Sequence, residues 1–155
     1  MTIANRALPK LVRNRIRRLQ RQMTKASWAI NTGKAKDSEA LFRTAIEQLQ
    51  WRRGGAVLVH SASEQLAQSG LSAIAMISIL EENILPEGTL LMPAFPFGND
   101  FFGYIQNNRT YDIRKTPSRA GIITEIFRRM PEVLRSMHPT HPVCAKGKMA
   151  EWFTE

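Results

Sequence analysis

The sequence predicts an α/β domain with a mainly parallel sheet, flanking helices and a basic helix in front of it. Two short apolar runs of the type found in buried strands, residues 56–59 and 89–92, stand on either side of a longer apolar stretch, residues 71–85. Strand, helix and strand in this order form a βαβ unit, whose strands we expect to be parallel with a right-handed crossover. The 155 residues suffice for one domain with a sizeable core.

The composition favours a soluble protein of the cytoplasm. Hydrophobic residues make up 43% of the chain, yet no apolar run reaches the roughly 18 residues that a membrane span needs. The N-terminus lacks the apolar segment of a secretory signal. The single cysteine, Cys144, cannot form an intrachain disulfide and fits a reducing compartment.

The formal net charge of +9 is concentrated in the first 36 residues. This arm holds 10 of the 22 lysines and arginines and no acidic residue, whereas residues 37–155 carry 12 basic and 13 acidic side chains. Apolar residues recur in the arm at helical spacing, which predicts a basic amphipathic helix: Leu8, Leu11, Val12, Ile16, Leu19 and Met23. Such a helix could contact an anionic membrane or nucleic acid, target an organelle, or pack its apolar stripe on the domain. Residues 31–36 then predict a linker before the domain, residues 37–155.

The domain is expected to begin with a helix capped by Asp37 or Ser38 and ending near Trp51. A turn at residues 52–55 leads into the first strand. The loop of His60, Ser61, Ala62 and Ser63 follows that strand directly. We therefore expect this loop at the carboxyl end of the sheet, where open α/β sheets bind ligands.

A long loop and a further helix are predicted after the second strand. Residues 93–115 are rich in aromatic side chains, which could form a functional lid or a satellite hydrophobic cluster. Thr116 and Pro117 predict the start of a helix, with Thr116 as N-cap and Pro117 in the first turn. This helix is expected to end at Met130 and Pro131.

Two of the three histidines lie in the segment "SMHPTHPV", residues 136–143, and each is followed by proline. Proline restricts the preceding residue to extended conformations, so the loop can hold His138 and His141 in defined orientations. Imidazole has the unperturbed pKa that suits proton abstraction near neutral pH. A plain structural turn and a zinc site are the alternatives, but the sequence has no second motif with metal-ligand spacing, and we expect no metal.

Four blocks of residues follow one another between residues 38 and 155. They are Val59-His60-Ser61-x-Ser63; Pro86-x-Gly88-Thr89-Leu90 with Met92-Pro93-x-Phe95; Tyr111-Asp112-x-Arg114-x-Thr116-Pro117-Ser118-Arg119-x-Gly121; and Arg135-Ser136-x-His138-Pro139-Thr140-His141-x-Val143-x-Ala145-x-Gly147. In content and order they resemble the aminoglycoside N3-acetyltransferase family, and the last block is the most specific.

The resemblance implies an acetyltransferase-like fold that transfers an acetyl group from acetyl-CoA to an amino group of an aminoglycoside or related amino sugar. His141 would be the general base, and His138 would shape the turn. The resemblance places the contacts with CoA in two loops: His60, Ser61, Ala62 and Ser63 in the first, and Thr116, Pro117 and Ser118 in the second. Backbone N–H groups in both loops are the expected donors.

Two features depart from the family pattern. Pro142 stands where the family usually has serine, and the chain ends at Glu155, whereas family members continue into a second half that supplies an acidic partner for the base. Residues 37–155 are therefore interpreted as the first half of a truncated domain, whose unpaired sheet edge would favour self-association. The alternative function is a non-catalytic remnant that its basic arm tethers to phosphate-rich surfaces.

Overall fold

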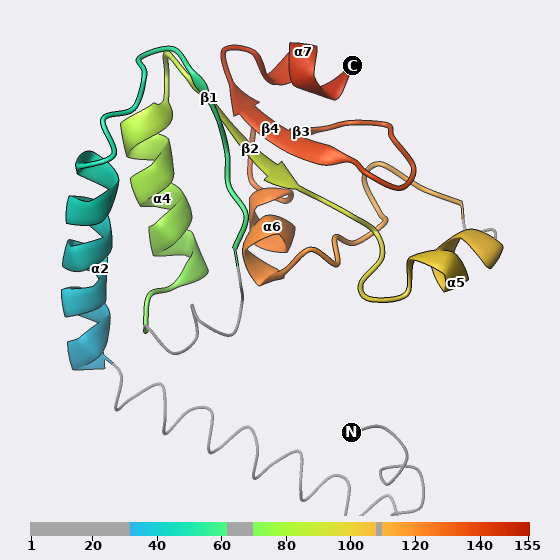
Figure 1. Ribbon diagram of the computed structural model, residues 1–155, viewed down its shortest axis with the longest axis horizontal. Coiled ribbons are helices and arrows are strands. Elements are labelled where there is room, and N and C mark those ends of the chain that lie inside the picture. The colour runs from blue at the N-terminus through green and yellow to red at the C-terminus, as the bar shows by residue number, and fades with distance from the viewer. Residues whose placement is uncertain (1–31, 62–69, 108–109) are drawn as a thin grey trace, which may run out of the picture.

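The computed structural model describes residues 32–61, 70–107 and 110–155, which form a four-stranded sheet with helices on both faces (Figure 1). The strand order is β1 (Ala56–Leu58), β2 (Thr89–Pro93), β4 (Val143–Gly147) and β3 (Leu134–Arg135). Residues 1–31, with the predicted amphipathic helix, lie outside the described residues. Within the described part of the chain, no helix has the length and apolar character that a membrane crossing requires.

The sheet is mixed, so the prediction of a mainly parallel sheet is wrong. β1 and β2 are parallel, with Ala56 opposite Thr89, and α4 (Ala73–Ile84) connects them, which confirms the predicted βαβ unit. β4 runs antiparallel to both β2 and β3. Residues 136–142 are enough to join β3 to an antiparallel β4, whereas a parallel pair needs a crossover of about a dozen residues or more.

The larger core lies between the sheet and the helices α4 and α6 (Ile122–Phe127). α4 begins at the N-cap Ser72, whose Oγ accepts a hydrogen bond from the Ala75 N–H at 3.0 Å. Its buried face packs on β2, all of whose residues are buried; the buried residues of this face are Met76, Ile77, Ile79, Leu80 and Ile84. A smaller cluster on the opposite face joins Leu91 and Ala145 to α7 (Ala150–Thr154).

The apolar sequence of β1 predicted a strand buried on both faces, and this prediction is wrong. Val57 packs against the larger core, but Leu58 remains 52% exposed. Leu58 lies opposite Leu91, on the sheet face that α7 covers. Because β1 is the outer strand and α7 covers Leu91 and Ala145 nearer the centre, this face of β1 stays open in the described structure.

The first described helix, α2 (Thr32–Glu47), begins earlier than predicted. It includes residues 32–36 of the expected linker, where Lys34, Ala35 and Lys36 are good helix formers and Gly33 lies in the first turn. It also ends before Trp51. α2 packs beside α4, where Arg43 forms an ion pair with Glu82.

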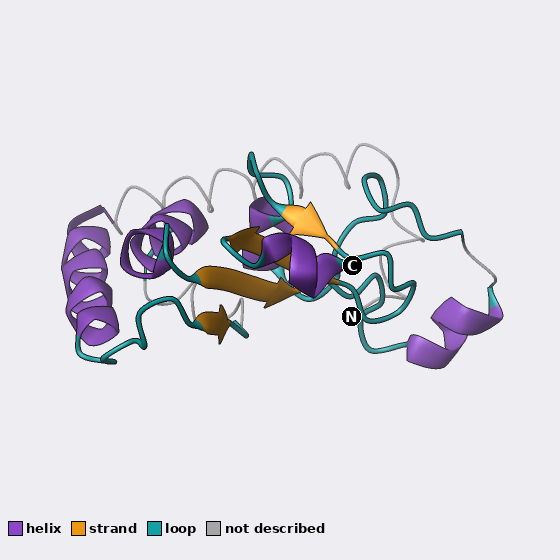
Figure 2. Ribbon diagram, turned by 90° about the horizontal axis from the view of Figure 1, so that it is seen from above, coloured by secondary structure: helices purple, strands orange, loops and turns teal. Residues whose placement is uncertain are grey.

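The predicted long loop after β2 contains a short helix, α5 (Phe101–Gln106). Asp100 caps it by accepting a hydrogen bond from the Gly103 N–H at 2.8 Å. Figures 1 and 2 show α5 at the opposite end of the molecule from α2. Tyr104 of α5 contacts the loop between β3 and β4, which holds His138 and His141.

Candidate active site

The loop of residues 136–142 lies at the carboxyl end of β2. Pro93, the last residue of β2, is opposite Val143, the first residue of β4. Beyond this pair the Ala94 N–H donates to the Pro142 carbonyl at 2.8 Å. The two parallel strands end on this side of the sheet, which is the side predicted to bind ligands.

Hydrogen bonds close the base of this loop and tie it to other segments. The Ser136 N–H donates to the Val143 carbonyl at 2.9 Å, and the Val143 N–H donates to Ser136 Oγ at 3.0 Å. The Tyr111 hydroxyl donates to the Ser136 carbonyl at 2.9 Å, and the Tyr104 hydroxyl donates to the Pro139 carbonyl at 3.1 Å. The loop is therefore held at its base and along its length.

His138 shapes the turn, as the resemblance implied. Its Nδ1 accepts a hydrogen bond from the His141 N–H at 2.9 Å, and the Thr140 N–H lies 3.4 Å from the same atom. The side chain thus takes the place of a backbone acceptor inside the turn.

The His141 ring is exposed on one side and surrounded by phenylalanine rings on others. Its centroid lies 5.3 Å from that of Phe95, 5.5 Å from Phe97 and 5.8 Å from Phe101. Phe95 and Phe97 are stacked on each other, so the aromatic residues of the long loop form a cluster beside His141. The sequence analysis had given two interpretations of these aromatic residues, a functional lid and a satellite hydrophobic cluster.

Thr140 is the hydrogen-bonding neighbour of the His141 ring: its Oγ1 lies 3.0 Å from His141 Nδ1. Among residues 32–61, 70–107 and 110–155, no carboxylate forms a hydrogen bond or ion pair with His141. The acidic partner that the resemblance implied is thus not found in this part of the chain.

Arg135 connects the segments around the site by buried hydrogen bonds, a role that the sequence analysis did not assign. It is only 7% exposed. Its Nη2 donates to the Ala94 carbonyl at 2.7 Å and its Nη1 to the Thr116 carbonyl at 2.5 Å. Its Cζ lies 5.0 Å from the centre of the Tyr111 ring, and burial lowers the pKa of the guanidinium. Arg135 therefore joins three segments that lie apart in the sequence.

Thr116, Pro117 and Ser118 do not begin a helix, and the prediction that they do is wrong. α6 begins six residues later, with Gly121 as N-cap. The Thr116 hydroxyl accepts instead from the Asp112 N–H at 2.8 Å, while the Thr116 N–H donates to the Asp112 carbonyl at 2.9 Å. The hydroxyl that would have capped a helix is used to close a turn.

This second predicted CoA loop also offers fewer free donors than expected. The Ser118 N–H donates to Glu125 Oε2 at 2.8 Å, and the Arg119 N–H donates to the Phe95 carbonyl at 2.6 Å. The backbone N–H groups are thus engaged within the protein, and Pro117 has none. The bond from Arg119 does place the loop beside the aromatic cluster at His141.

Glu125 anchors this loop to α6. Its carboxylate accepts from Arg128 Nη2 at 2.7 Å and from Arg129 Nε at 2.7 Å, in addition to the Ser118 N–H. These bonds, that of Arg128 above all, lower the pKa of Glu125 to about 2.

The first predicted CoA loop is described only in part. His60 follows β1 and is exposed; the Val59 N–H just before it donates to the Leu91 carbonyl at 2.9 Å. His60 and Ser61 therefore lie at the same sheet end as the histidine loop, although no hydrogen bond or ring contact in the described structure joins them to His141. Ala62 and Ser63 lie outside the described residues.

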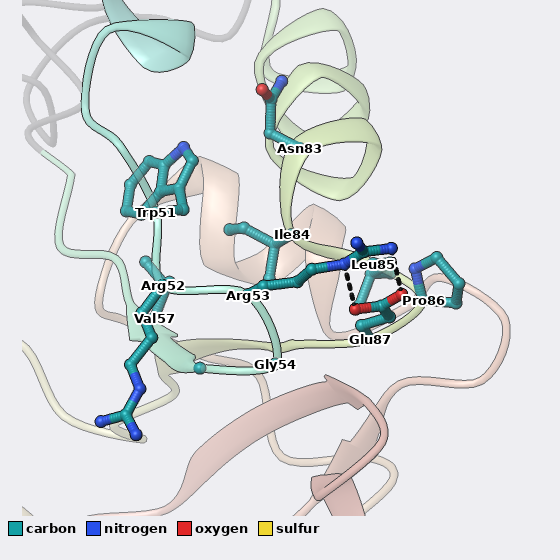
Figure 3. A pocket seen from close by; sticks show the side chains of 11 residues that line it. Trp51, Arg52, Arg53, Gly54, Val57, Asn83, Ile84, Leu85, Pro86 and Glu87 are labelled. Atoms are coloured by element: carbon teal, nitrogen blue, oxygen red, sulfur yellow. Dashed lines mark hydrogen bonds and ion pairs between the residues drawn. The ribbon is translucent and has the colours of Figure 1, made fainter.

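Cavities lie at both ends of the sheet. One of about 230 Å³ adjoins the aromatic cluster and is lined by Phe97, Tyr104 and Arg119 among others. Another of about 330 Å³ lies at the amino ends of β1 and β2 (Figure 3). Trp51 and Arg52 line it, together with Arg53 and Glu87, which form an ion pair.

Cys144 is not a nucleophile candidate, because burial raises the pKa of its thiol to about 12. The described residues also contain no group of three or more His, Cys, Asp or Glu side chains that could hold a metal ion.

Comparison with known proteins gives a consistent result. Residues 58–155 match the family model described as aminoglycoside 3-N-acetyltransferase. A curated relative, the SPbeta prophage-derived aminoglycoside N(3')-acetyltransferase-like protein YokD of Bacillus subtilis (strain 168), is 30% identical over 119 residues, which cover 66% of this chain and 44% of YokD.

Solved structures show the same partial overlap. The crystal structure of YokD superposes with a TM-score of 0.61 at 27% identity, over 76% of this chain and 52% of YokD. The apoenzyme of aminoglycoside acetyltransferase AAC(3)-IVa gives a TM-score of 0.62 at 27% identity, over 76% of this chain and 42% of that protein. Mutant AAC(3)-IVa has been solved with a gentamicin and with apramycin. The chain spans about half the length of these relatives.

Proposed function

This chain belongs to the aminoglycoside 3-N-acetyltransferase family, and from that membership we propose that it transfers an acetyl group from acetyl-CoA to an amino group of an aminoglycoside or related amino sugar, with His141 as general base. The observation that carries the proposal is the exposed imidazole of His141 on a loop fixed by hydrogen bonds. The complexes of mutant AAC(3)-IVa with a gentamicin and with apramycin support an aminoglycoside as acceptor.

The chemistry requires one acyl transfer and the movement of a proton from nitrogen to sulfur. The amine of the acceptor attacks the thioester carbonyl, the C–S bond breaks, and CoA leaves as a thiolate. His141 takes the proton that the nitrogen loses as the amide forms and gives it to the thiolate, which yields the CoA thiol. A neutral imidazole suits this step near neutral pH.

His141 is exposed, so an acceptor amine can reach its imidazole. The rings of Phe95, Phe97 and Phe101 lie beside the imidazole and carry no polar atom that would compete with the amine for it.

We propose that acetyl-CoA contacts the two loops that the resemblance implies. His60, Ser61, Ala62 and Ser63 follow β1, and Thr116, Pro117 and Ser118 lie beside the Phe95 segment. Because the backbone N–H groups of the second loop are engaged and Ser118 is buried, that loop would contribute the exposed Pro117 ring and the Thr116 hydroxyl rather than an anion site.

The test is acetyl transfer by the full chain with gentamicin or apramycin, measured as the release of free CoA thiol. We expect His141→Ala to lower turnover by roughly 10²-fold or more, the usual scale for loss of a general base. Acetyl-CoA binding, measured by calorimetry, should remain, because His141 acts on the amine.

Arg114→Ala is the matched control, since Arg114 is an exposed residue of the third sequence block whose hydrogen bonds here come from its backbone alone. Its turnover should equal that of the wild type. Equal turnover of wild type and His141→Ala would exclude His141 as the base, and absence of acetylation by the wild type would exclude the activity itself.

A further inference from the structure

Three side-chain atoms form a short row in the histidine loop. Thr140 Oγ1 lies 3.0 Å from His141 Nδ1 and 3.4 Å from His138 Nδ1. A threonine hydroxyl has one proton to donate and two lone pairs to accept with. It can therefore serve as donor to one histidine and as acceptor from the other.

The backbone determines the protonation of the first histidine. His138 Nδ1 accepts from the His141 N–H at 2.9 Å, and an amide nitrogen can only donate. His138 Nδ1 therefore carries a lone pair, so neutral His138 has its proton on Nε2.

The direction of the Thr140 bonds follows from this lone pair. If the Thr140 proton pointed to His141, an oxygen lone pair of Thr140 would face the lone pair of His138 Nδ1, and that contact would be repulsive. With the proton pointing to His138, both contacts are favourable: Thr140 donates to His138 Nδ1 and accepts from a proton on His141 Nδ1.

We propose that Thr140 is a positioning residue that holds His141 in the Nδ1–H tautomer and so leaves the lone pair on His141 Nε2. The tautomer follows from these contacts alone, whereas its use by a catalytic base rests on the proposed function. In an Nδ1–H tautomer, Nε2 is the nitrogen that can accept a proton from an acceptor amine.

In the part of the chain that the structure describes, the other neighbours of His141 offer no competing partner. Phe95, Phe97 and Phe101 surround the ring and carry no polar side-chain atom. His138 is the titratable side chain in ring contact with His141 in the described structure, with centroids 5.8 Å apart. Among the described residues, the Thr140 hydroxyl is the hydrogen-bonding partner of His141 Nδ1.

Nitrogen-15 NMR of the full chain, without any substrate, tests the tautomers directly. The chain has only three histidines, so spectra of His60→Gln and His141→Gln suffice to assign the rings. At a pH where the imidazoles are neutral, we expect His138 as the Nε2–H form and His141 as the Nδ1–H form. A wild-type His141 in the Nε2–H form would overturn the proposal.

Thr140→Val keeps the shape of the side chain and removes the hydroxyl. We expect the ratio of Nδ1–H to Nε2–H in His141 to fall by about fivefold, the scale of one hydrogen bond. His138 should stay unchanged, because its backbone donor remains, and this also shows that the loop is intact. Thr140→Ser should restore the wild-type ratio.

Kinetics extend the test if the chain is active. Thr140→Val should lower kcat about as much as it depletes the Nδ1–H form and leave KM for acetyl-CoA unchanged, with Thr140→Ser recovering the loss. An unchanged His141 tautomer in Thr140→Val contradicts the proposal. Because the spectra need no substrate, an inactive wild type would refute the proposed function and leave this result standing.

Discussion

The two ends of the sheet hold polar groups in opposite ways. At the amino ends of β1 and β2, Arg53 and Glu87 line a cavity as an ion pair with 86% and 51% of their side chains exposed (Figure 3). At the carboxyl ends, Arg135 is only 7% exposed and donates to carbonyls of two distant segments. The amino ends thus carry an exposed ion pair beside a cavity, and the carboxyl ends carry the buried hydrogen bonds of Arg135.

This difference shows why cavity size alone does not identify the candidate site. A cavity lined by exposed turn residues forms without buried hydrogen bonds to distant segments. Burying a guanidinium costs free energy unless hydrogen bonds satisfy it, and Arg135 has no acidic partner among the described residues. This buried guanidinium lies at the end of the sheet that carries the loop of His138 and His141.

The largest effect that would sharpen the comparison is expected for Arg135→Met. Methionine fills a similar volume but leaves the carbonyls of Ala94 and Thr116 buried without their donor. Hydrogen bonds to a charged group contribute about 1.5–3 kcal/mol each, and the guanidinium recovers some of its own desolvation on removal. We expect a loss of about 3 kcal/mol in the free energy of unfolding, measured by urea denaturation.

Arg114→Met is the control for this loss, because Arg114 is exposed and should change the free energy of unfolding by less than about 0.5 kcal/mol. Equal stabilities of the two variants would show that the buried network does not hold this end together, and the contrast between the two ends would disappear.

The parts of the fold that the sequence predicted are those set by local pattern. The helix predicted for residues 71–85 is found at Ala73–Ile84, with Ser72 as its cap, because a run of apolar residues after a capping serine leaves little alternative. The position of His60 after a strand follows equally from neighbours in the sequence.

The parts that were missed depend on residues far apart. Leu58 has the sequence of a buried strand, but its exposure depends on how far α7 extends over the sheet. Thr116 has the pattern of an N-cap, yet Asp112 captures its hydroxyl first.

One feature of the sequence pointed to a buried Arg135, namely its position directly after the apolar residues Val133 and Leu134. Its partners at Ala94 and Thr116 lie 41 and 19 residues away, and no local pattern reveals them.

A smaller effect is expected at the loop of Ser118, where Glu125→Gln removes the charge that accepts from Arg128 and from the backbone. We expect a loss of about 1–2 kcal/mol at neutral pH, the scale of hydrogen bonds to a charged group. The pKa of Glu125 is lowered to about 2 in the folded protein, against an ordinary value of 4.5. The stabilisation is therefore present above about pH 4.5 and is lost as the pH falls toward 2.

Unfolding free energies of wild type and Glu125→Gln, measured between neutral pH and pH 2, check this dependence. The two curves should converge as the pH falls below 4.5. A difference that stays constant over this range would mean that the charge of Glu125 does not act in the folded state.

The smallest effect is expected at the opposite end of the sheet, for Arg53→Ala and Glu87→Ala. Both carboxylate oxygens of Glu87 accept from the Arg53 guanidinium, at 2.5 and 2.6 Å, yet both side chains are largely in water. Solvent screening and the entropy of two ordered side chains cancel most of the attraction in such pairs. A double-mutant cycle by urea denaturation should give a coupling below about 1 kcal/mol, and acetyl transfer should be unchanged in all three variants. A coupling as large as the effect of Arg135→Met, or a fall in turnover, would show that the cavity end is built for function as well, and the two ends of the sheet would then not differ in the way their contacts indicate.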